Sequence, residues 1–197
     1  MNPDAWRSYL LARLWQRLRR TDAAIAAYRD ALAADPGFMR AAHPLAYLLG
    51  RQHRYAEAET ILRQVVARAP RNAAAWFNVG YVCDQQHNTE AARAAFEEAV
   101  RLDPKLDHAW YGLGLCHGTR GDHAAAVHAF ERVIQLEPMN WHAWYELGMA
   151  QHRAHQPDKV KSVVEHLNRY ERRPARKLIL DTERWELSPP VADLRVK

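Results

Sequence analysis

The residues of this chain whose types could support chemistry are mainly its eleven histidines and two cysteines. His152 and His155 stand three residues apart, and Cys83, Cys116 and His117 fall in neighbouring predicted helices. Neither set has the spacing of a metal site with a fixed fourth donor, and two adjacent residues on a helix point in different directions. We therefore expect no metal site, and we interpret the histidines as solvated or at the edge of a core.

Other catalytic devices find equally little support. The glycines at 112, 114, 118 and 121 lie along a predicted helix and its closing turn, whereas a phosphate-binding loop follows a strand. Among the serines, cysteines and carboxylates, no pair stands out as a nucleophile with its base. We predict that the protein is not an enzyme and uses no cofactor.

The elements that position these residues are revealed by a period in the prolines. Pro36, Pro70, Pro104 and Pro138 are spaced 34 residues apart, although the chain holds only ten prolines. A fixed period between about 20 and 50 residues is typical of stacked repeats.

Other positions of the repeat follow the same period. Counted back from each proline, and from Arg172 where a fifth would fall, they alternate between large and small residues, as two packed antiparallel helices require. Three such positions read Ser8, Ala42, Trp76, Trp110 and Trp144; then Ala12, Ala46, Gly80, Gly114 and Gly148; then Tyr28, Leu62, Phe96, Phe130 and Val164.

These positions resemble the tetratricopeptide repeat family, whose pattern is Trp-x-x-Leu-Gly-x-x-Tyr, then Ala-x-x-x-Phe, then Pro. The resemblance covers roughly residues 5–172, with units at about 5–38, 39–72, 73–106, 107–140 and 141–172. It weakens in the first and fifth units, as is usual for terminal repeats. It implies an all-α fold, a right-handed α-solenoid of antiparallel helix hairpins.

Residues 173–197 break the period. Leu178, Ile179 and Thr182 recur at helical spacing together with Trp185, so we expect a capping helix over Ala175–Leu187, followed by a loose tail. Trp185 either covers the last hairpin or anchors a partner.

In the resembled architecture the first helix of each hairpin lines a concave groove. Its ring position holds Tyr9, His43, Phe77, Tyr111 and Tyr145. One turn further on stand Arg13, Tyr47, Tyr81, Leu115 and Met149, and three residues before the ring position are Arg40, His108 and His142. Asn78 is the one residue there that resembles the carboxylate clamp of chaperone-binding relatives.

Two interpretations of the groove remain open. Aromatic anchors of this kind can hold a partner peptide or helix, which makes the protein an adaptor or an assembly chaperone. Alternatively, the rings pack against the neighbouring helix.

A basic cluster suggests a further alternative, a nucleic acid or an acidic partner bound at the C-terminal end. Its residues are Arg169, Arg172, Arg173, Arg176 and Lys177, in a chain of net charge +5. They can equally be the solvated exterior of an end cap.

Composition bears on the cellular address. No apolar stretch approaches the length of a membrane span, and the N-terminus lacks the features of a signal peptide. Two cysteines suit a reducing compartment, so we expect a cytoplasmic protein, with arginine-rich composition typical of a bacterial genome. The identity of the partner and the oligomeric state are not encoded in any pattern here.

Overall fold

The structure, a computed structural model, describes residues 2–184 and 187. Within these residues the chain forms helices joined by short turns, and consecutive helices pair into hairpins. The helices are α1 (Pro3–Arg17), α2 (Thr21–Ala34), α3 (Met39–Arg51), α4 (Tyr55–Arg68), α5 (Ala73–Gln85), α6 (Thr89–Leu102), α7 (Asp107–Thr119), α8 (His123–Leu136), α9 (Trp141–Arg153), α10 (Pro157–Tyr170) and α11 (Arg172–Asp181).

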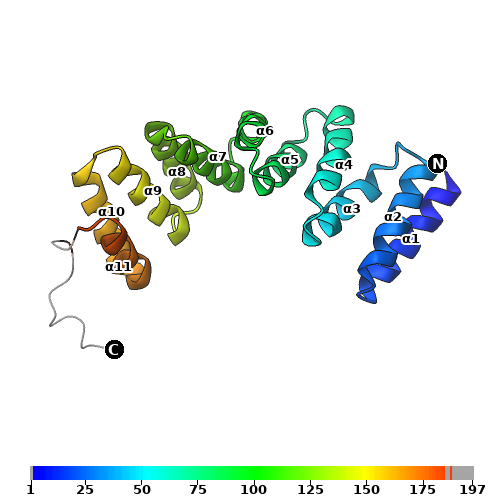
Figure 1. The fold of residues 1–197 in the computed structure, drawn as a ribbon, viewed down its shortest axis with the longest axis horizontal. Helices are drawn as coiled ribbons and strands as arrows, with labels where there is room; N and C mark the ends of the chain where they lie inside the picture. The colour runs from blue at the N-terminus through cyan, green and yellow to red at the C-terminus, as the bar shows by residue number, and fades with distance from the viewer. Residues whose placement is uncertain (1, 185–186, 188–197) are drawn as a thin grey trace. The chain divides into compact units, whose positions relative to one another are not determined.

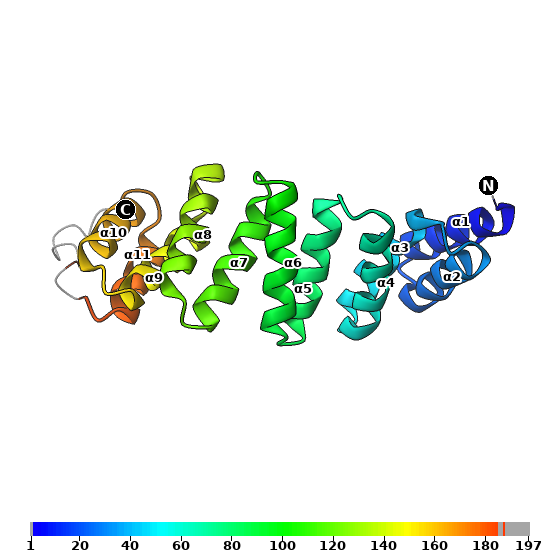
Figure 2. The same ribbon diagram turned by 90° about the horizontal axis from the view of Figure 1, so that it is seen from above.

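Two compact units make up the chain. The first, Met1–Asp103, holds the pairs α1/α2, α3/α4 and α5/α6, and in it α2 also packs on α3 and α4 on α5 (Figure 1). The second, Pro104–Lys197, holds α7/α8 and α9/α10, with α8 packed on α9 and α11 packed on both α9 and α10 (Figure 2). The predicted all-α fold of antiparallel helical hairpins with a C-terminal cap is confirmed.

The turn inside each hairpin has one geometry throughout. Asn88 donates its backbone N–H to the Cys83 carbonyl at 3.0 Å, and His87 donates to Asp84 at 2.8 Å, which together form a Schellman motif. The residue at its centre has a positive φ in every hairpin: Arg19, His53, His87, Gly121 and His155. Histidine enters this left-handed conformation more readily than most residues. The backbone therefore explains the placement of three of the eleven histidines.

The proline and tryptophan positions of the repeat are linked by a hydrogen bond. The indole N–H donates to the carbonyl of the proline six residues earlier, at 2.9 Å for Trp76, 3.0 Å for Trp110 and 2.8 Å for Trp144. This bond fixes the turn between hairpins to the helix that follows it.

Two glycine positions permit the close helix approach that the sequence predicts. A Cβ on Gly80 would lie 2.6 Å from the ring of Phe96, and one on Gly114 would lie 2.7 Å from the ring of Phe130. Because these phenylalanines are buried, only glycine fits beside them.

The fifth hairpin completes its core differently. Val164 stands where the third and fourth hairpins have phenylalanine, and the space beside Gly148 is filled by Leu178 of α11, 2.5 Å from a Cβ built there. Leu178 and Ile179 are fully buried with the side chains of α9 and α10. The last helix therefore caps the fifth hairpin.

The bounds of the cap differ from the prediction of Ala175–Leu187. The helix begins at Arg172, since Pro174 falls within the first turn, where a missing N–H breaks no hydrogen bond. It ends at Asp181, because Glu183 adopts a positive φ and Arg184 donates to the Ile179 carbonyl. Trp185 and the predicted tail lie outside the described residues.

Candidate functional site

The first helices α1, α3 and α5 of the first unit bring together eight residues of the predicted groove. A hollow opens on this side, between α1 and α3, with a volume of about 710 Å³. We call it the arginine hollow; it is lined by Tyr9, Arg13, Leu14, Gln16, Arg17, Tyr28, Arg40 and Pro44. Three guanidinium groups and no carboxylate stand among these side chains, so it suits a negatively charged group.

Hydrogen bonds order the wall of the arginine hollow. Arg13 donates through Nη1 to the Tyr9 hydroxyl at 3.1 Å, and the Tyr28 hydroxyl donates to Gln16 Oε1 at 2.8 Å. Burial raises the pKa of Tyr28 further above neutral pH, where its hydroxyl is already a hydrogen-bond donor. These bonds leave the remaining Arg13 donors available to a ligand.

A smaller hollow adjoins the other side of α3. We call it the Gly50 notch; it has a volume of about 160 Å³ and is lined by His43, Ala46, Tyr47, Gly50, Arg51, Leu62, Asn78, Tyr81 and Val82. A Cβ on Gly50 would meet nothing within 4 Å, so this glycine opens the notch. Tyr47 and Tyr81 stand at its rim with 60% and 47% of their surface exposed. An exposed ring on each side of a side-chain-sized hollow is suited to gripping an apolar side chain.

The second unit carries an equivalent notch, 68 residues further along the chain. It is opened by Gly118, whose Cβ would also meet nothing, and has a volume of about 130 Å³. The lining differs in chemistry: Glu146 takes the place of Asn78, Thr119 takes the place of Arg51, and Arg153 is added. Burial raises the pKa of Glu146, while Arg153 and Lys177 lower it.

Residues at the ring position pack mainly inside their own hairpins. Tyr111 meets the Phe130 ring edge-on, with centroids 5.7 Å apart, and Phe77 lies 5.9 Å from Phe96. Tyr9 packs on Phe38 at 5.5 Å. These three rings make the packing contacts of the alternative interpretation, and Tyr9 in addition lines the arginine hollow.

Tyr145 is occupied by the cap. Its hydroxyl donates to the Asp181 carboxylate, and the Lys177 ammonium lies 4.4 Å from the centre of its ring. Burial first, and then the bond to Asp181, raises the pKa of this tyrosine. The ring of the fifth hairpin is thus held by α11.

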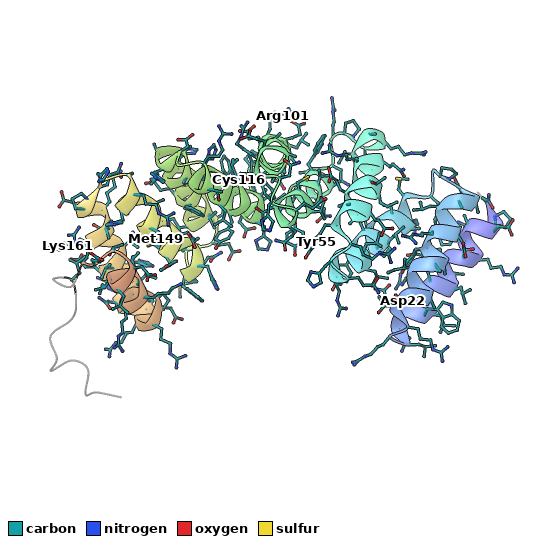
Figure 3. All side chains as sticks on the ribbon, in the orientation of Figure 1. Asp22, Tyr55, Arg101, Cys116, Met149 and Lys161 are labelled. Carbon is teal, nitrogen blue, oxygen red and sulfur yellow. The ribbon has the colours of Figure 1, made fainter. Side chains whose placement is uncertain are left out.

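The other predicted groove residues are more scattered. His108 is exposed beside Asp107, and His142 is exposed and stacks on Trp141 with centroids 3.4 Å apart. Leu115 and Met149 are half-buried against the core of the second unit. Met149 lies on α9, as Figure 3 shows. Arg40 lies over the Trp6 ring, 5.4 Å from its centre.

The predicted basic cluster is the outer side of the cap. Arg172, Arg173, Arg176 and Lys177 are exposed on α11, opposite its buried residues, and Arg169 is exposed near the end of α10.

Several lining residues were missed by the sequence analysis. Gln16 and Gly50 occupy the same position of the repeat, two turns beyond the ring position, and only a survey of every inward position would have included them. Glu146 occupies the repeat position of Asn78, which the analysis did include, so the signal for it was present.

Across residues 2–184, no group of three or more histidines, cysteines or carboxylates is close enough to hold a metal ion. No helix among the described residues is long and apolar enough to cross a bilayer. Both cysteines are buried and neither forms a disulfide, and burial raises the pKa of Cys83 to about 11.

Sequence models of the tetratricopeptide repeat match three stretches of the chain, residues 8–38, 43–107 and 108–140. With the hairpins described above, these matches decide the family. The chain belongs to the tetratricopeptide repeat family. A search of curated proteins found no matching relative.

Solved tetratricopeptide repeat structures share the fold. A structure of MamA protein superposes with a TM-score of 0.78 at 22% identity, covering 96% of this chain and all of that one. YrrB, described as a TPR protein with an unusual peptide-binding site, has a TM-score of 0.77 at 19% identity, with 92% of each chain covered. PilF of Pseudomonas aeruginosa has a TM-score of 0.73 at 20% identity, covering 90% of this chain and 82% of that one. Proteins of this fold are generally interaction scaffolds rather than enzymes.

Proposed function

We propose that this tetratricopeptide repeat protein is a cytoplasmic, non-catalytic adaptor or assembly chaperone that holds a partner segment on its first unit. The segment lies across α1, α3 and α5, places a carboxylate in the arginine hollow and inserts an apolar side chain into the Gly50 notch. The observation that carries the proposal is the adjacency of these two hollows on α3, one basic and one rimmed by exposed tyrosines.

The chemistry of the two hollows defines the kind of segment. Each exposed ion pair contributes up to about 1 kcal/mol, so three arginines give a modest, salt-sensitive attraction for acidic residues. A tyrosine-rimmed notch adds larger apolar burial, about 1.5–3 kcal/mol for one leucine or phenylalanine. We therefore expect a motif with one or two acidic residues beside a bulky apolar one. The likeness in fold to a structure described as having a peptide-binding site agrees with this use.

The cytoplasmic address is supported by the two cysteines. Both are buried in the hairpin core and neither forms a disulfide, as is usual in a reducing compartment.

Selection of peptides from a random displayed library tests the proposal without knowledge of the partner. Peptides that bind the full chain should be enriched in acidic residues and in one bulky apolar residue at a fixed spacing. The best peptide is then measured by calorimetry against Gly50→Leu, which fills the notch, and against Gly118→Leu, the matched change in the second unit. Binding that weakens at least tenfold with Gly50→Leu alone supports the proposal, and binding unaffected by Gly50→Leu overturns it.

The basic side of α11 supports a second candidate, the binding of nucleic acid. Four of its ten residues are basic, and its one acidic residue, Asp181, is engaged by Tyr145. A gel shift with single- and double-stranded probes at low ionic strength tests this candidate. Retardation that disappears on replacing Arg173 and Arg176 with alanine supports it, and no retardation removes it.

A further inference from the structure

A second surface, which shares Leu14 with the arginine hollow, lies on the side of α1 away from its buried residues Ala5 and Ala12. Leu11, Leu14 and Leu18 follow one another at helical spacing and are 44%, 50% and 56% exposed, with Leu10 beside them at 60%. We call these four residues the leucine face. Four half-exposed leucines on one side of a helix form a larger apolar patch than single surface residues normally do.

Equivalent positions elsewhere in the array are covered by a helix. The counterparts of Leu11 and Leu14 in α3, α5 and α9 are at most 4% exposed; they are Leu45, Val79, Leu147, Leu48, Val82 and Ala150. In each case the second helix of the preceding hairpin packs there, α2 on α3, α4 on α5 and α8 on α9. The architecture itself therefore shows that a helix fits over these positions.

Hydrogen bonds join the same pairs of helices, α2 with α3 and α4 with α5, just after the C-terminal ends of α3 and α5. Gln52, which follows α3, donates to Asp22 of α2 at 2.7 Å, and Gln86, which follows α5, donates to Glu59 of α4 at 2.7 Å. The corresponding residue after α1 is Leu18, so there the polar link is replaced by another apolar side chain. None of the described helices covers this face of α1.

Charge at the leucine face selects among possible occupants. Arg7, one turn before Leu11, stands where α3, α5 and α9 have the buried alanines Ala41, Ala75 and Ala143. Arg17, one turn after Leu14, also lines the arginine hollow, and both arginines are exposed. A second copy pairing symmetrically through this face would bring these like charges together, which is unfavourable. An acidic helix would instead pair with them.

We infer that the leucine face binds an amphipathic helix of another protein, with an apolar stripe toward α1 and acidic residues at its edges. The bound helix takes the place that the second helix of a preceding hairpin takes elsewhere in the array. Contacts at i, i+3 and i+7 of this kind are the usual way in which a helix is held on a helical surface.

Two synthetic helical peptides test the inference. Both are cross-linked to stay helical and share one leucine stripe, but one carries glutamate and the other lysine at its remaining positions. Fluorescence anisotropy with the full chain should show the glutamate peptide binding at least tenfold more tightly at low salt. Leu11→Glu should weaken its binding about tenfold or more, since the apolar contact of one leucine is lost. Tyr81→Ala, at the Gly50 notch, should leave it unchanged.

The variants remain interpretable because the leucines are half-exposed, so Leu11→Glu is expected to unfold at the temperature of the parent. Leu18→Glu, at the end of α1, is the second variant if Leu11→Glu destabilises the chain. Equal binding of the two peptides, or binding lost with Tyr81→Ala and kept with Leu11→Glu, overturns the inference. A dimer in sedimentation that Leu11→Glu dissociates also overturns it, because a second copy would then be the occupant. None of these results depends on the fate of the Gly50→Leu experiment.

Discussion

The two kinds of glycine in the first helices give opposite predictions for the same substitution. Gly50→Ala places a methyl group in open space, and it removes the entropic disadvantage of glycine in a helix, about 0.5–1 kcal/mol. Gly80→Ala removes the same entropic disadvantage of glycine, but its methyl group meets the buried Phe96 ring at 2.6 Å. Overpacking of this kind costs about 1–3 kcal/mol. We expect Gly50→Ala to raise the free energy of unfolding and Gly80→Ala to lower it.

Thermal and urea unfolding followed by circular dichroism measure both variants. At about 2–4 °C per kcal/mol for a chain of this size, the two midpoints should separate by several degrees in opposite directions from the parent. Gly118→Ala and Gly114→Ala form a second matched pair in the other unit. Gly80→Ala combined with Phe96→Leu should recover part of the loss, because the shorter side chain makes room. Two variants shifted in the same direction would refute the reasoning.

Three further predictions concern the turns, the linking hydrogen bond and pH. His87→Gly should stabilise the chain by about 1 kcal/mol in urea titrations, since a residue with a Cβ is strained at positive φ, and Gly121→Ala should destabilise it similarly; no change in either would contradict the turn geometry. Trp110→Phe removes the hydrogen bond to the Pro104 carbonyl and should lower the free energy of unfolding by about 1 kcal/mol. An unchanged urea midpoint would show that this hydrogen bond does not contribute to stability. Because burial raises the pKa of Glu146 in the folded state, that state binds more protons, and stability falls as pH rises from the unfolded pKa through the folded one. Glu146→Gln should remove this part of the pH dependence and be more stable at pH 7, and a profile identical to the parent between pH 4 and 8 would contradict it.

Much of the fold follows from the sequence, because each position of the repeat has one dominant physical demand. Gly80 must be glycine to admit Phe96, and Trp76 recurs with Pro70 because the indole binds the proline carbonyl. The cap lies outside the repeat, so no repeat position defines its ends, and its predicted bounds differ from those of α11. The α11 helix starts before Pro174, and it ends at a turn whose positive-φ residue is Glu183, so no proline or glycine marks this end in the sequence.

The candidate site was less predictable from the sequence. The repeat register identifies which residues point inward, but it does not say which of them are already satisfied. Tyr81 and Tyr111 look alike in sequence, yet Tyr81 is exposed at a notch and Tyr111 packs on Phe130. Tyr145 is held by Asp181. Asp181 lies in a segment outside the 34-residue period, so the repeat pattern could not predict this contact. Openings such as the Gly50 notch depend on what surrounds a glycine, and this appears only when the helices are packed.

Site-specific photo-crosslinking in the native cell tests the central claim most directly. A photoreactive phenylalanine analogue is introduced at Tyr47, on the rim of the Gly50 notch, and in a control at Arg101, exposed on α6 of the same unit (Figure 3). We predict one discrete adduct from position 47 and none from position 101, with the adduct lost on adding Gly50→Leu. Adducts from position 101 alone, or an adduct from position 47 that survives Gly50→Leu, would contradict partner binding at this site.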